Sequence, residues 1–343
     1  MSRRCTRCQT VYAGDTRFCP RDGSPLVEVA GAAATPSGSA GSESSKTMVR
    51  AAVKRQLGPS VDQAGALQGE IIDGRYKVLK QLGEGGMSYV YEARELNTGN
   101  SVAVKVLTPK LIADDTAMQR LRREAGLAMR LNHPNTCSIL RFGETETGLI
   151  YLVMPYLKGE LLSDKETRTG PMTLEMGMPL LIQICEGLHH AHGLQIIHRD
   201  LKPENVMIVV DGDRERAVVM DFGLAKDRGA SSLSKLTATG IVLGTPEFMS
   251  PEQVRGQDID ARSDVYALGI LAFEMFTGKL PFEGRSAQEI MIARLRGKAL
   301  PLGHHRPDLP SKLEKVLMKS MDANPDKRYS STKEFGLALA SSI

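Results

Sequence analysis

The chain has 343 residues, 41% hydrophobic and 24% charged, a length that suits two domains or one two-lobed domain with an appendage. Its net charge is +4, but residues 69–343 hold equal numbers of basic and acidic side chains, which gives no support to a nucleic-acid-binding core. No apolar stretch approaches the roughly 18–20 residues of a membrane span, and the N-terminal segment lacks an apolar signal-peptide core. We therefore expect a cytoplasmic protein without nucleic acid or membrane partners.

Residues 1–26 form a small basic head whose cysteines nearly complete a metal site. Cys5, Cys8 and Cys19 are followed by Asp22, which stands where the spacing calls for a fourth ligand. Zinc accepts both thiolate and carboxylate, and so short a segment cannot build a sufficient core without such a staple. We predict a small zinc module here, with a metal-free or redox role of the cysteines as the alternative.

Residues 27–70 are predicted to be a flexible linker. The stretch EVAGAAATPSGSAGSESSKT is dominated by Ala, Gly and Ser and cannot bury enough apolar surface to fold alone. The segment MVRAAVKRQL (48–57) could form a short basic amphipathic helix with a docking role, although a partly ordered linker is the favoured interpretation.

Residues 71–343 are expected to form one continuous α+β domain with two lobes and a cleft between them. Alternating patterns in the small lobe (71–157) predict strands, and one charged run there predicts a helix. Helical periodicity dominates the large lobe (158–343). The predicted strands are 75–83, 88–95, 101–107 and 148–154, and the predicted helices are 114–131, 176–192 and 264–278.

Two patterns in the small lobe suit a nucleotide. Gly83, Gly85 and Gly86 lie between two strand patterns and let backbone N–H groups approach a phosphate, although a plain hairpin turn would look similar. No Lys-Ser/Thr follows as in a Walker loop, and a strand follows where a dinucleotide fold would open a helix. In SVAVKVL the period of two places Ala103 and Lys105 on one face, which suits a slot for a flat base and its phosphates.

The large lobe carries a rarer set of motifs in a fixed order. They are IIHRDLKPENVMI (196–208), VVMDFGLAK (218–226), GTPEFMSPE (244–252), DVYALG (264–269) and NPDKRY (324–329). Together with the glycine loop and Lys105, they resemble the motif set of bacterial, eukaryotic-like Ser/Thr protein kinases over about residues 74–343. The head resembles the short, degenerate zinc-ribbon segments that precede some of these kinases. The resemblance implies the two-lobed protein kinase fold and an ATP-dependent phosphotransferase acting on Ser/Thr hydroxyls of proteins.

The resemblance also implies catalytic roles. Asp200 would take the proton from the substrate hydroxyl, and Lys202 would neutralise charge on the transferring phosphoryl group. Asn205 and Asp221 would hold Mg²⁺ or Mn²⁺. Phosphoryl transfer needs positioning and charge neutralisation more than covalent chemistry, which is why these residue types serve it.

The nucleotide would be held by the small lobe and the segment that joins the lobes. The three glycines would cover the phosphates, and Lys105, positioned by Glu124, would hold the α- and β-phosphates. The residues expected around adenine are Leu82, Val90, Ala103, Met154 and Met207, with Pro155 and Leu157 offering a carbonyl and an N–H. Pro155 replaces a common Glu, Ser88 replaces the third glycine of the loop and Ser250 replaces an Ala, and none of these departures removes a catalytic group.

Regulation is expected in the activation segment. Thr237 and Thr239 are candidate autophosphorylation sites, because a phosphothreonine could pair with Arg199 and order the segment. The competing functional class is a kinase-fold scaffold that recruits partners through its head, and a kinase of small molecules is a weaker third option. The intact catalytic set favours an enzyme.

Other features have a structural interpretation. His198 is expected to pack near Phe222, and the histidines of HHAH (189–192) are expected at the surface or at a helix end. Cys137 and Cys185 are expected in the core. Arg328 is expected to pair with Glu252 and to brace the large lobe.

Overall fold

The structure is a computed structural model that describes residues 2–5, 11–13, 26–28, 64–85, 88–108, 115–222 and 246–343. The chain divides into two units, Met1–Val53 and Lys54–Ile343. No helix in the described ranges is long and apolar enough to cross a membrane. The domain boundaries expected after residues 26 and 70 stay predictions.

The described part of the first unit is a three-stranded antiparallel sheet. It consists of β1 (Ser2–Cys5), β2 (Val11–Ala13) and β3 (Leu26–Glu28) in the order β2-β1-β3. Cys5 ends the central strand and lies opposite Leu26. Cys8, Cys19 and Asp22 lie outside the described residues, so the zinc site stays a prediction.

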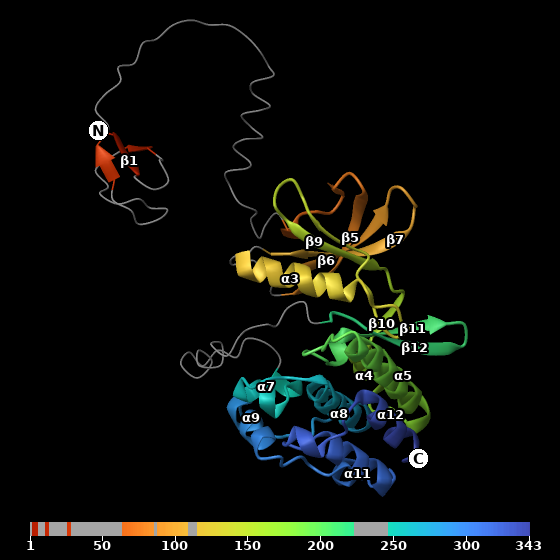
Figure 1. Ribbon diagram of the computed structural model, residues 1–343. Helices are drawn as coiled ribbons and strands as arrows, with labels where there is room; N and C mark the ends of the chain where they lie inside the picture. The colour runs from red at the N-terminus through yellow and green to blue at the C-terminus, as the bar shows by residue number, and fades with distance from the viewer. Residues whose placement is uncertain are drawn as a thin grey trace, which may run out of the picture. The chain divides into compact units, whose positions relative to one another are not determined.

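A six-stranded antiparallel sheet forms the small lobe of the second unit (Figure 1). Its order is β4-β5-β6-β7-β9-β8, and the four strands predicted from alternation are β5, β6, β7 and β9. The bounds are β4 (Ile71–Ile72), β5 (Tyr76–Gly85), β6 (Ser88–Glu95), β7 (Ser101–Leu107), β8 (Arg141–Glu144) and β9 (Ile150–Pro155). One face buries Tyr76, Tyr91 and Tyr151, because side chains of one parity along each strand share that face.

The charged helix of the small lobe is α3 (Asp115–Ala128), close to the predicted 114–131. Leu121, Ala125 and Ala128 are buried in the same hydrophobic cluster as Leu107 and Leu152 of the sheet. The spacing of three and four residues places these apolar side chains on one helix face. Figure 1 shows α3 lying along the sheet.

The large lobe is mainly helical, as predicted, and contains a short antiparallel sheet in the order β10-β11-β12. Its strands are β10 (Gly159–Leu161), β11 (Val206–Asp211) and β12 (Arg214–Val219). Its α-helices are α4 (Leu162–Thr169), α5 (Leu174–Gly193), α7 (Pro251–Arg255), α8 (Ala261–Thr277), α9 (Ala287–Leu295), α10 (Leu302–His305), α11 (Ser311–Ser320) and α12 (Thr332–Ala340). Short 3₁₀ turns are η2 (Pro203–Asn205), η3 (Pro246–Phe248) and η4 (Pro325–Lys327).

Helix α8 lies at the centre of the large lobe, and most of its side chains are buried. A helix that is apolar on nearly every side must be enclosed, and α8 packs against α5, α11 and α12. It begins three residues before the predicted 264, because the side chain of Asp260 caps it by accepting from the N–H of Arg262.

Candidate active site

The sheet of the small lobe brings the predicted nucleotide-binding residues to neighbouring positions. Val90 on β6 lies opposite Gly83 on one side and Lys105 on the other, and Ala103 lies opposite Met154. Gly85 ends β5, Pro155 ends β9, Leu157 follows it, and Leu82 is partly exposed on β5. Met207 on β11 pairs with Leu161 and Val218 in the large lobe. Gly86 lies outside the described residues.

Lys105 reaches from the small lobe to Asp221, with 2.7 Å between Nζ and Oδ2. Burial alone would raise the pKa of Asp221, but the charge and hydrogen bond of Lys105, with His198 and Lys202 adding to them, lower it overall. Asp221 is therefore ionised at neutral pH. The sheet and the end of the large-lobe strand β12 thus meet at one carboxylate.

The loop that carries Asp200 is tied to Asp221 by hydrogen bonds. The Asn205 side-chain amide donates to the carbonyl of Asp200 at 2.7 Å. The N–H of Met220, next to Asp221, donates to the carbonyl of Asn205 at 2.8 Å. Both predicted metal ligands and the predicted base therefore lie on one short hydrogen-bonded path, with Lys202 contributing to the charge around Asp221.

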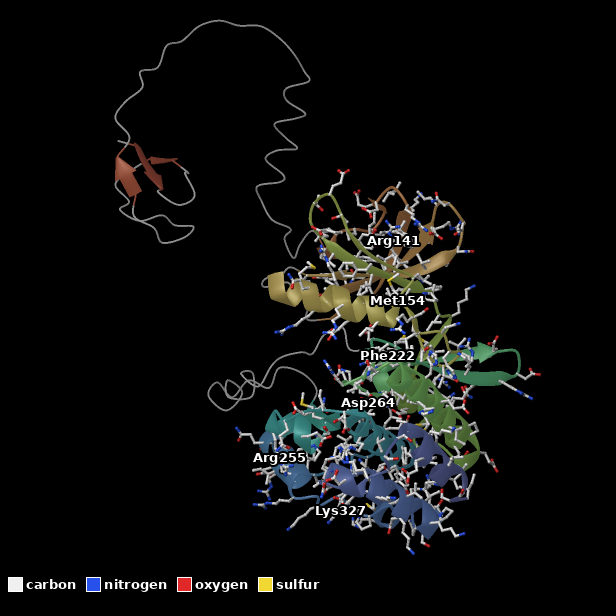
Figure 2. All side chains as sticks on the ribbon, viewed as in Figure 1. Arg141, Met154, Phe222, Arg255, Asp264 and Lys327 are labelled. Atoms are coloured by element: carbon white, nitrogen blue, oxygen red, sulfur yellow. The ribbon has the colours of Figure 1, made fainter. Side chains whose placement is uncertain are left out.

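The carboxylate of Asp264 anchors the backbone of the same loop. Its Oδ2 accepts from the N–H of His198 at 2.8 Å and its Oδ1 from the N–H of Arg199 at 3.0 Å. The ring Nε2 of His192 lies 2.7 Å from Oδ2. Asp264 is 1% exposed, and a buried carboxylate with three partners is a rigid anchor. In Figure 2, Met154, Phe222 and Asp264 follow one another from the small lobe into the large lobe.

Backbone strain is found at the same place. Arg199 and Asp221 are two of the four non-glycine residues in the described ranges with positive φ, at 66° and 56°. Such conformations persist only where the surroundings hold them, and they gather at functional sites. Arg199 is held on both sides, because its N–H donates to Asp264 and its carbonyl accepts from Nε2 of Gln253 at 2.8 Å.

The pairing of Lys105 differs from the sequence expectation. Lys105 was expected to be positioned by Glu124, but in the described part of the chain its ion-pair partner is Asp221. Glu124 on α3 instead lies beside Arg199, with 3.6 Å between Oε1 and Nη1. The carboxylates of Asp221 and Glu124 both lie near basic side chains at this junction, so charge alone does not determine which of them pairs with Lys105. Thr237 and Thr239 lie outside the described residues.

Four acidic side chains interact electrostatically close to the catalytic loop: Glu166 on α4, Glu204 in η2, Glu247 in η3 and Glu274 on α8. Burial raises the pKa of Glu166 to about 8, and the charges of Glu274 and Glu204 add to the shift. Burial likewise raises the pKa of Glu274 to about 7, with Glu204 and Glu247 adding to it. Protonation of this acidic group therefore changes within the neutral pH range.

The structural interpretations from the sequence can be compared with these contacts. His198 is buried with its ring centroid 5.0 Å from that of Phe222, which confirms the expected packing. Cys137 and Cys185 are buried, also as expected. His190 and His192 lie in the last turn of α5, at a helix end as expected, and the side chain of His192 is 8% exposed and also reaches Asp264.

Asp264 stands in the DVYALG motif, but the sequence did not predict a role for it in the site. Nor did it predict one for Gln253, which joins α7 to the carbonyl before Asp200. Asp264 stands in a quoted motif and Gln253 directly follows another, but their partners lie 54 to 72 residues away in sequence, so neither contact has a local signal.

A buried ion pair braces the large lobe, as the sequence predicted. Arg328 contacts both carboxylate oxygens of Glu252 at 2.7 Å, and Ser263 donates to the same carboxylate at 2.6 Å. Burial alone would raise the pKa of Glu252, but the hydrogen bonds from Arg328 and Ser263 lower it to about 2. The pair therefore stays charged at any physiological pH.

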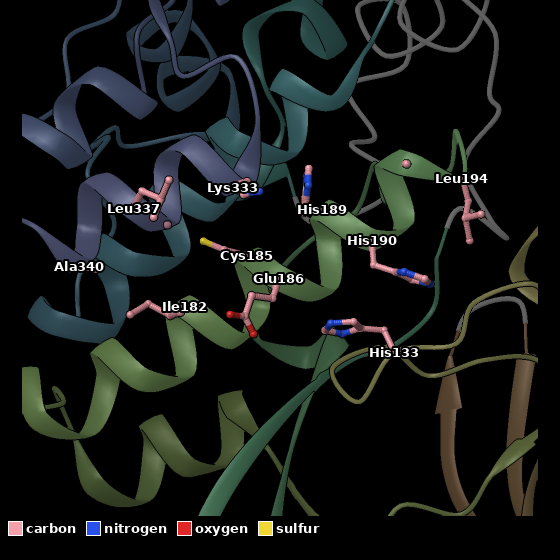
Figure 3. A pocket seen from close by; sticks show the side chains of 12 residues that line it. His133, Ile182, Cys185, Glu186, His189, His190, Leu194, Lys333, Leu337 and Ala340 are labelled. Carbon is pink, nitrogen blue, oxygen red and sulfur yellow. The ribbon is translucent and has the colours of Figure 1, made fainter.

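A cavity of about 620 Å³ lies between α5, α12 and the loop around His133 (Figure 3). The rings of His133 and His190 stack in its wall with centroids 5.3 Å apart. Burial raises the pKa of the Cys185 thiol, so this lining residue is not a reactive thiolate. The lining includes none of the predicted catalytic or nucleotide-binding residues. We therefore take the junction at Asp221, where the charged groups converge, as the candidate active site.

Comparisons with known proteins identify the family of the chain. A family model described as the protein kinase domain matches residues 76–336. The chain is 39% identical over 275 residues to the serine/threonine-protein kinase pkn3 of Myxococcus xanthus, covering 79% of this chain and 50% of that protein. It is 38% identical over 268 residues to PrkC of Bacillus subtilis, covering 78% of this chain and 40% of that protein. The chain thus spans half or less of the length of these curated relatives.

Solved structures show the same two-lobed architecture. The kinase domain of PknI from Mycobacterium tuberculosis superposes with a TM-score of 0.64 at 26% identity, over 80% of this chain and 98% of that chain. A crystal structure of Rad53 in complex with AMP-PNP superposes with a TM-score of 0.63 at 25% identity, over 76% of this chain and 64% of that chain. The predicted kinase fold, with a sheet-rich small lobe and a helical large lobe, is confirmed. The chain belongs to the protein kinase domain family, and its second unit is of the bacterial Ser/Thr kinase type.

Proposed function

We propose that this chain is an ATP- and Mg²⁺-dependent protein kinase that transfers the γ-phosphoryl group of ATP to Ser and Thr hydroxyls of proteins. The observation that carries the proposal is the junction at Asp221, where Lys105 of the small lobe meets the hydrogen-bonded loop of Asp200 and Asn205. Phosphoryl transfer requires a cation for the phosphates, oxygen ligands for a metal and a carboxylate base within one site. The junction offers a candidate residue for each of these three roles.

The donor atoms at the junction fit magnesium or manganese. Asn205 uses its side-chain N–H on Asp200, which leaves the amide oxygen for a cation, and Asp221 is kept ionised by Lys105. Hard divalent cations prefer such oxygen ligands. When bound, the metal would neutralise charge on the phosphates.

The chain's own groups would act on the nucleotide and the acceptor. Lys105 would hold the α- and β-phosphates, Asp200 would orient the acceptor hydroxyl and take its proton, and Lys202 would offset charge on the transferred group. Leu82, Val90, Ala103, Met154 and Met207 would enclose adenine, with the glycine loop over the phosphates. The Rad53 structure, which is a complex with AMP-PNP, supports a nucleotide as the ligand.

Activation would involve a change of ion-pair partners. We propose that autophosphorylation of Thr237, Thr239 or both draws Arg199 towards the phosphate and releases Glu124 to position Lys105. The present pairs, Lys105 with Asp221 and Glu124 with Arg199, would then belong to a less active arrangement. Full activity of the Thr237→Ala/Thr239→Ala protein towards a protein substrate would overturn this idea.

The head would serve as an accessory module. We propose that Cys5, Cys8, Cys19 and Asp22 hold zinc and that the module docks a partner. Metal analysis of the full chain would give about one zinc per molecule, lost on Cys5→Ser substitution. Wild-type protein without stoichiometric zinc would end this part of the proposal.

The need for ATP and Mg²⁺ also favours a cytoplasmic location.

Incubation of the purified chain with labelled ATP and Mg²⁺, followed by mass-spectrometric site mapping, tests the function. We expect label on Ser and Thr residues of added casein or of the chain itself, and none after chelation of the metal. Nucleotide binding without any transfer would favour the scaffold alternative.

A further inference from the structure

Arg294 is a buried arginine whose place in the large lobe the catalytic machinery does not explain. It lies in the last turn of α9 and is 1% exposed. Its guanidinium carbon lies 5.8 Å from the ring centroid of Phe282, which stacks in turn on Tyr266 with centroids 6.2 Å apart. In the described ranges no carboxylate lies within ion-pair distance of it.

Packing alone does not account for an arginine at this position. Burial lowers its pKa, and its Nε has no hydrogen-bond partner among the residues that the structure describes. A buried charge without a counter-ion is destabilising relative to an apolar side chain of similar volume. The role of Arg294 therefore lies in the groups to which its side-chain N–H groups donate.

Those donors reach the backbone that follows the activation segment. Nη2 donates to the carbonyl of Glu247, and Nη1 donates to the carbonyl of Met249 at 3.5 Å, the long limit of a hydrogen bond. Alternate carbonyls of one short segment are thus held by one planar group, a geometry that a lysine cannot reproduce.

The same segment continues to the catalytic loop by further hydrogen bonds. Ser250 caps α7, with its N–H donating to Oε1 of Gln253 at 2.9 Å. Gln253 then donates from Nε2 to the carbonyl of Arg199, the residue before Asp200. These hydrogen bonds connect the segment that Arg294 holds to the residue before Asp200, so the segment lies beside the place where an acceptor hydroxyl would approach the predicted base.

We propose that Arg294 is a positioning residue for the protein substrate, which fixes the backbone of residues 246–250 as the surface against which the acceptor segment binds. This rests on the proposed kinase function. The proposal predicts that replacing Arg294 weakens binding of the protein substrate, while the binding of ATP and the rate of the chemical step change little.

The test compares full-length wild type, Arg294→Met, Arg294→Lys and the control Arg296→Met, an exposed arginine two residues along the chain. Steady-state kinetics with casein and ATP are combined with amide hydrogen exchange of residues 246–253. We expect Arg294→Met to raise the KM for casein at least about tenfold, with kcat and the KM for ATP within about threefold. Arg294→Lys should lie between, and Arg296→Met should match wild type. Exchange should rise at 246–250 in the Arg294 variants.

A purely structural role would give a different pattern. The proposal is overturned if the KM for casein is unchanged, or if kcat, the KM for ATP and the melting temperature change along with it. Should Arg294→Met fail to fold, Arg294→Lys carries the same comparison. Wild type that transfers no phosphate to casein or to itself would contradict the kinase function, while the exchange of residues 246–250 would still decide whether Arg294 holds this segment.

Discussion

A buried ion pair of the large lobe and a surface pair of the small lobe hold their charges in different ways. In the large lobe, the pair of Arg328 and Glu252 is almost fully buried, with side chains 0% and 7% exposed. On the small lobe, the pair of Arg122 and Glu144 has side chains 57% and 49% exposed. At the junction, Lys105 and Asp221 are intermediate at 13% and 34%.

This difference indicates which parts of the site are preorganised. The large lobe holds the catalytic loop through buried groups with several partners each, so its geometry exists before any ligand binds. Surface pairs of the small lobe such as Arg122 and Glu144 are more accessible, and their charged partners can be exchanged without opening a core. The comparison predicts large, cooperative losses for changes in the large lobe and small ones for surface pairs of the small lobe.

The largest effect on stability is expected from Arg328→Met. The substitution leaves the buried carboxylate of Glu252 without its main partner, which should lower the free energy of unfolding by about 3–5 kcal/mol. Urea denaturation followed by circular dichroism measures this. A loss below about 1 kcal/mol would remove the distinction between the lobes.

The second effect is expected from Asp264→Asn. The amide cannot accept from the N–H groups of His198 and Arg199 and from His192 as the carboxylate does, so we expect a loss of roughly 2–3 kcal/mol in stability. The displaced loop should also lower kcat by roughly 10- to 100-fold. Asp258→Asn, an exposed control in the same lobe, should change neither. Unchanged kcat in Asp264→Asn would show that this anchor is not needed for positioning.

An intermediate effect is expected in the pH dependence of stability. Because the folded state raises the pKa of Glu166 to about 8, it keeps a proton that the unfolded chain releases near its ordinary pKa. The free energy of unfolding should therefore fall as pH rises from about 5 to 9, with Glu166 contributing about 1–3 kcal/mol of that fall.

Glu166→Gln, which stays neutral throughout, should flatten this dependence. The control Glu175→Gln replaces an exposed glutamate in the first turn of α5 and should leave the slope as in wild type. Urea midpoints at several pH values provide the measurement. Equal slopes for Glu166→Gln and wild type would contradict the raised pKa.

The smallest effect is expected from Arg122→Met. Its partner Glu144 lies 3.3 Å away in an exposed pair, so stability should change by less than about 1 kcal/mol and become less sensitive to salt. A loss comparable to that of Arg328→Met under the same urea conditions would show that exposure does not separate the two lobes.

Much of the fold was accessible from the sequence because its signals are local. Alternation identified β5, β6, β7 and β9, and the motif order identified the family. Short strands were missed, among them β1 to β4, β8, β10 and β12, since segments such as RERAVV are too short and too charged to show a period of two. Element ends depended on single caps such as Asp260.

The site was harder to predict where contacts join distant segments. Asp264 holds the loop of Asp200 from 66 positions away, and nothing in its neighbours indicates that contact. Arg294 stands in the last turn of α9, a helix without a clear apolar face, so its burial depends on how α9 packs against the rest of the lobe. The partners of Lys105 and Glu124 depended on the spatial arrangement of several charges, which composition and spacing do not specify.

The most direct test of the account is transfer of phosphate by the Asp200→Asn protein beside wild type, with nucleotide affinity measured on both. We expect kcat towards casein to fall roughly 10²–10⁴-fold while the affinity for ATP·Mg²⁺ stays within about threefold, because Asp200 acts on the acceptor hydroxyl. Wild-type turnover in the Asp200→Asn protein would contradict the central claim that this chain catalyses phosphoryl transfer at Asp200.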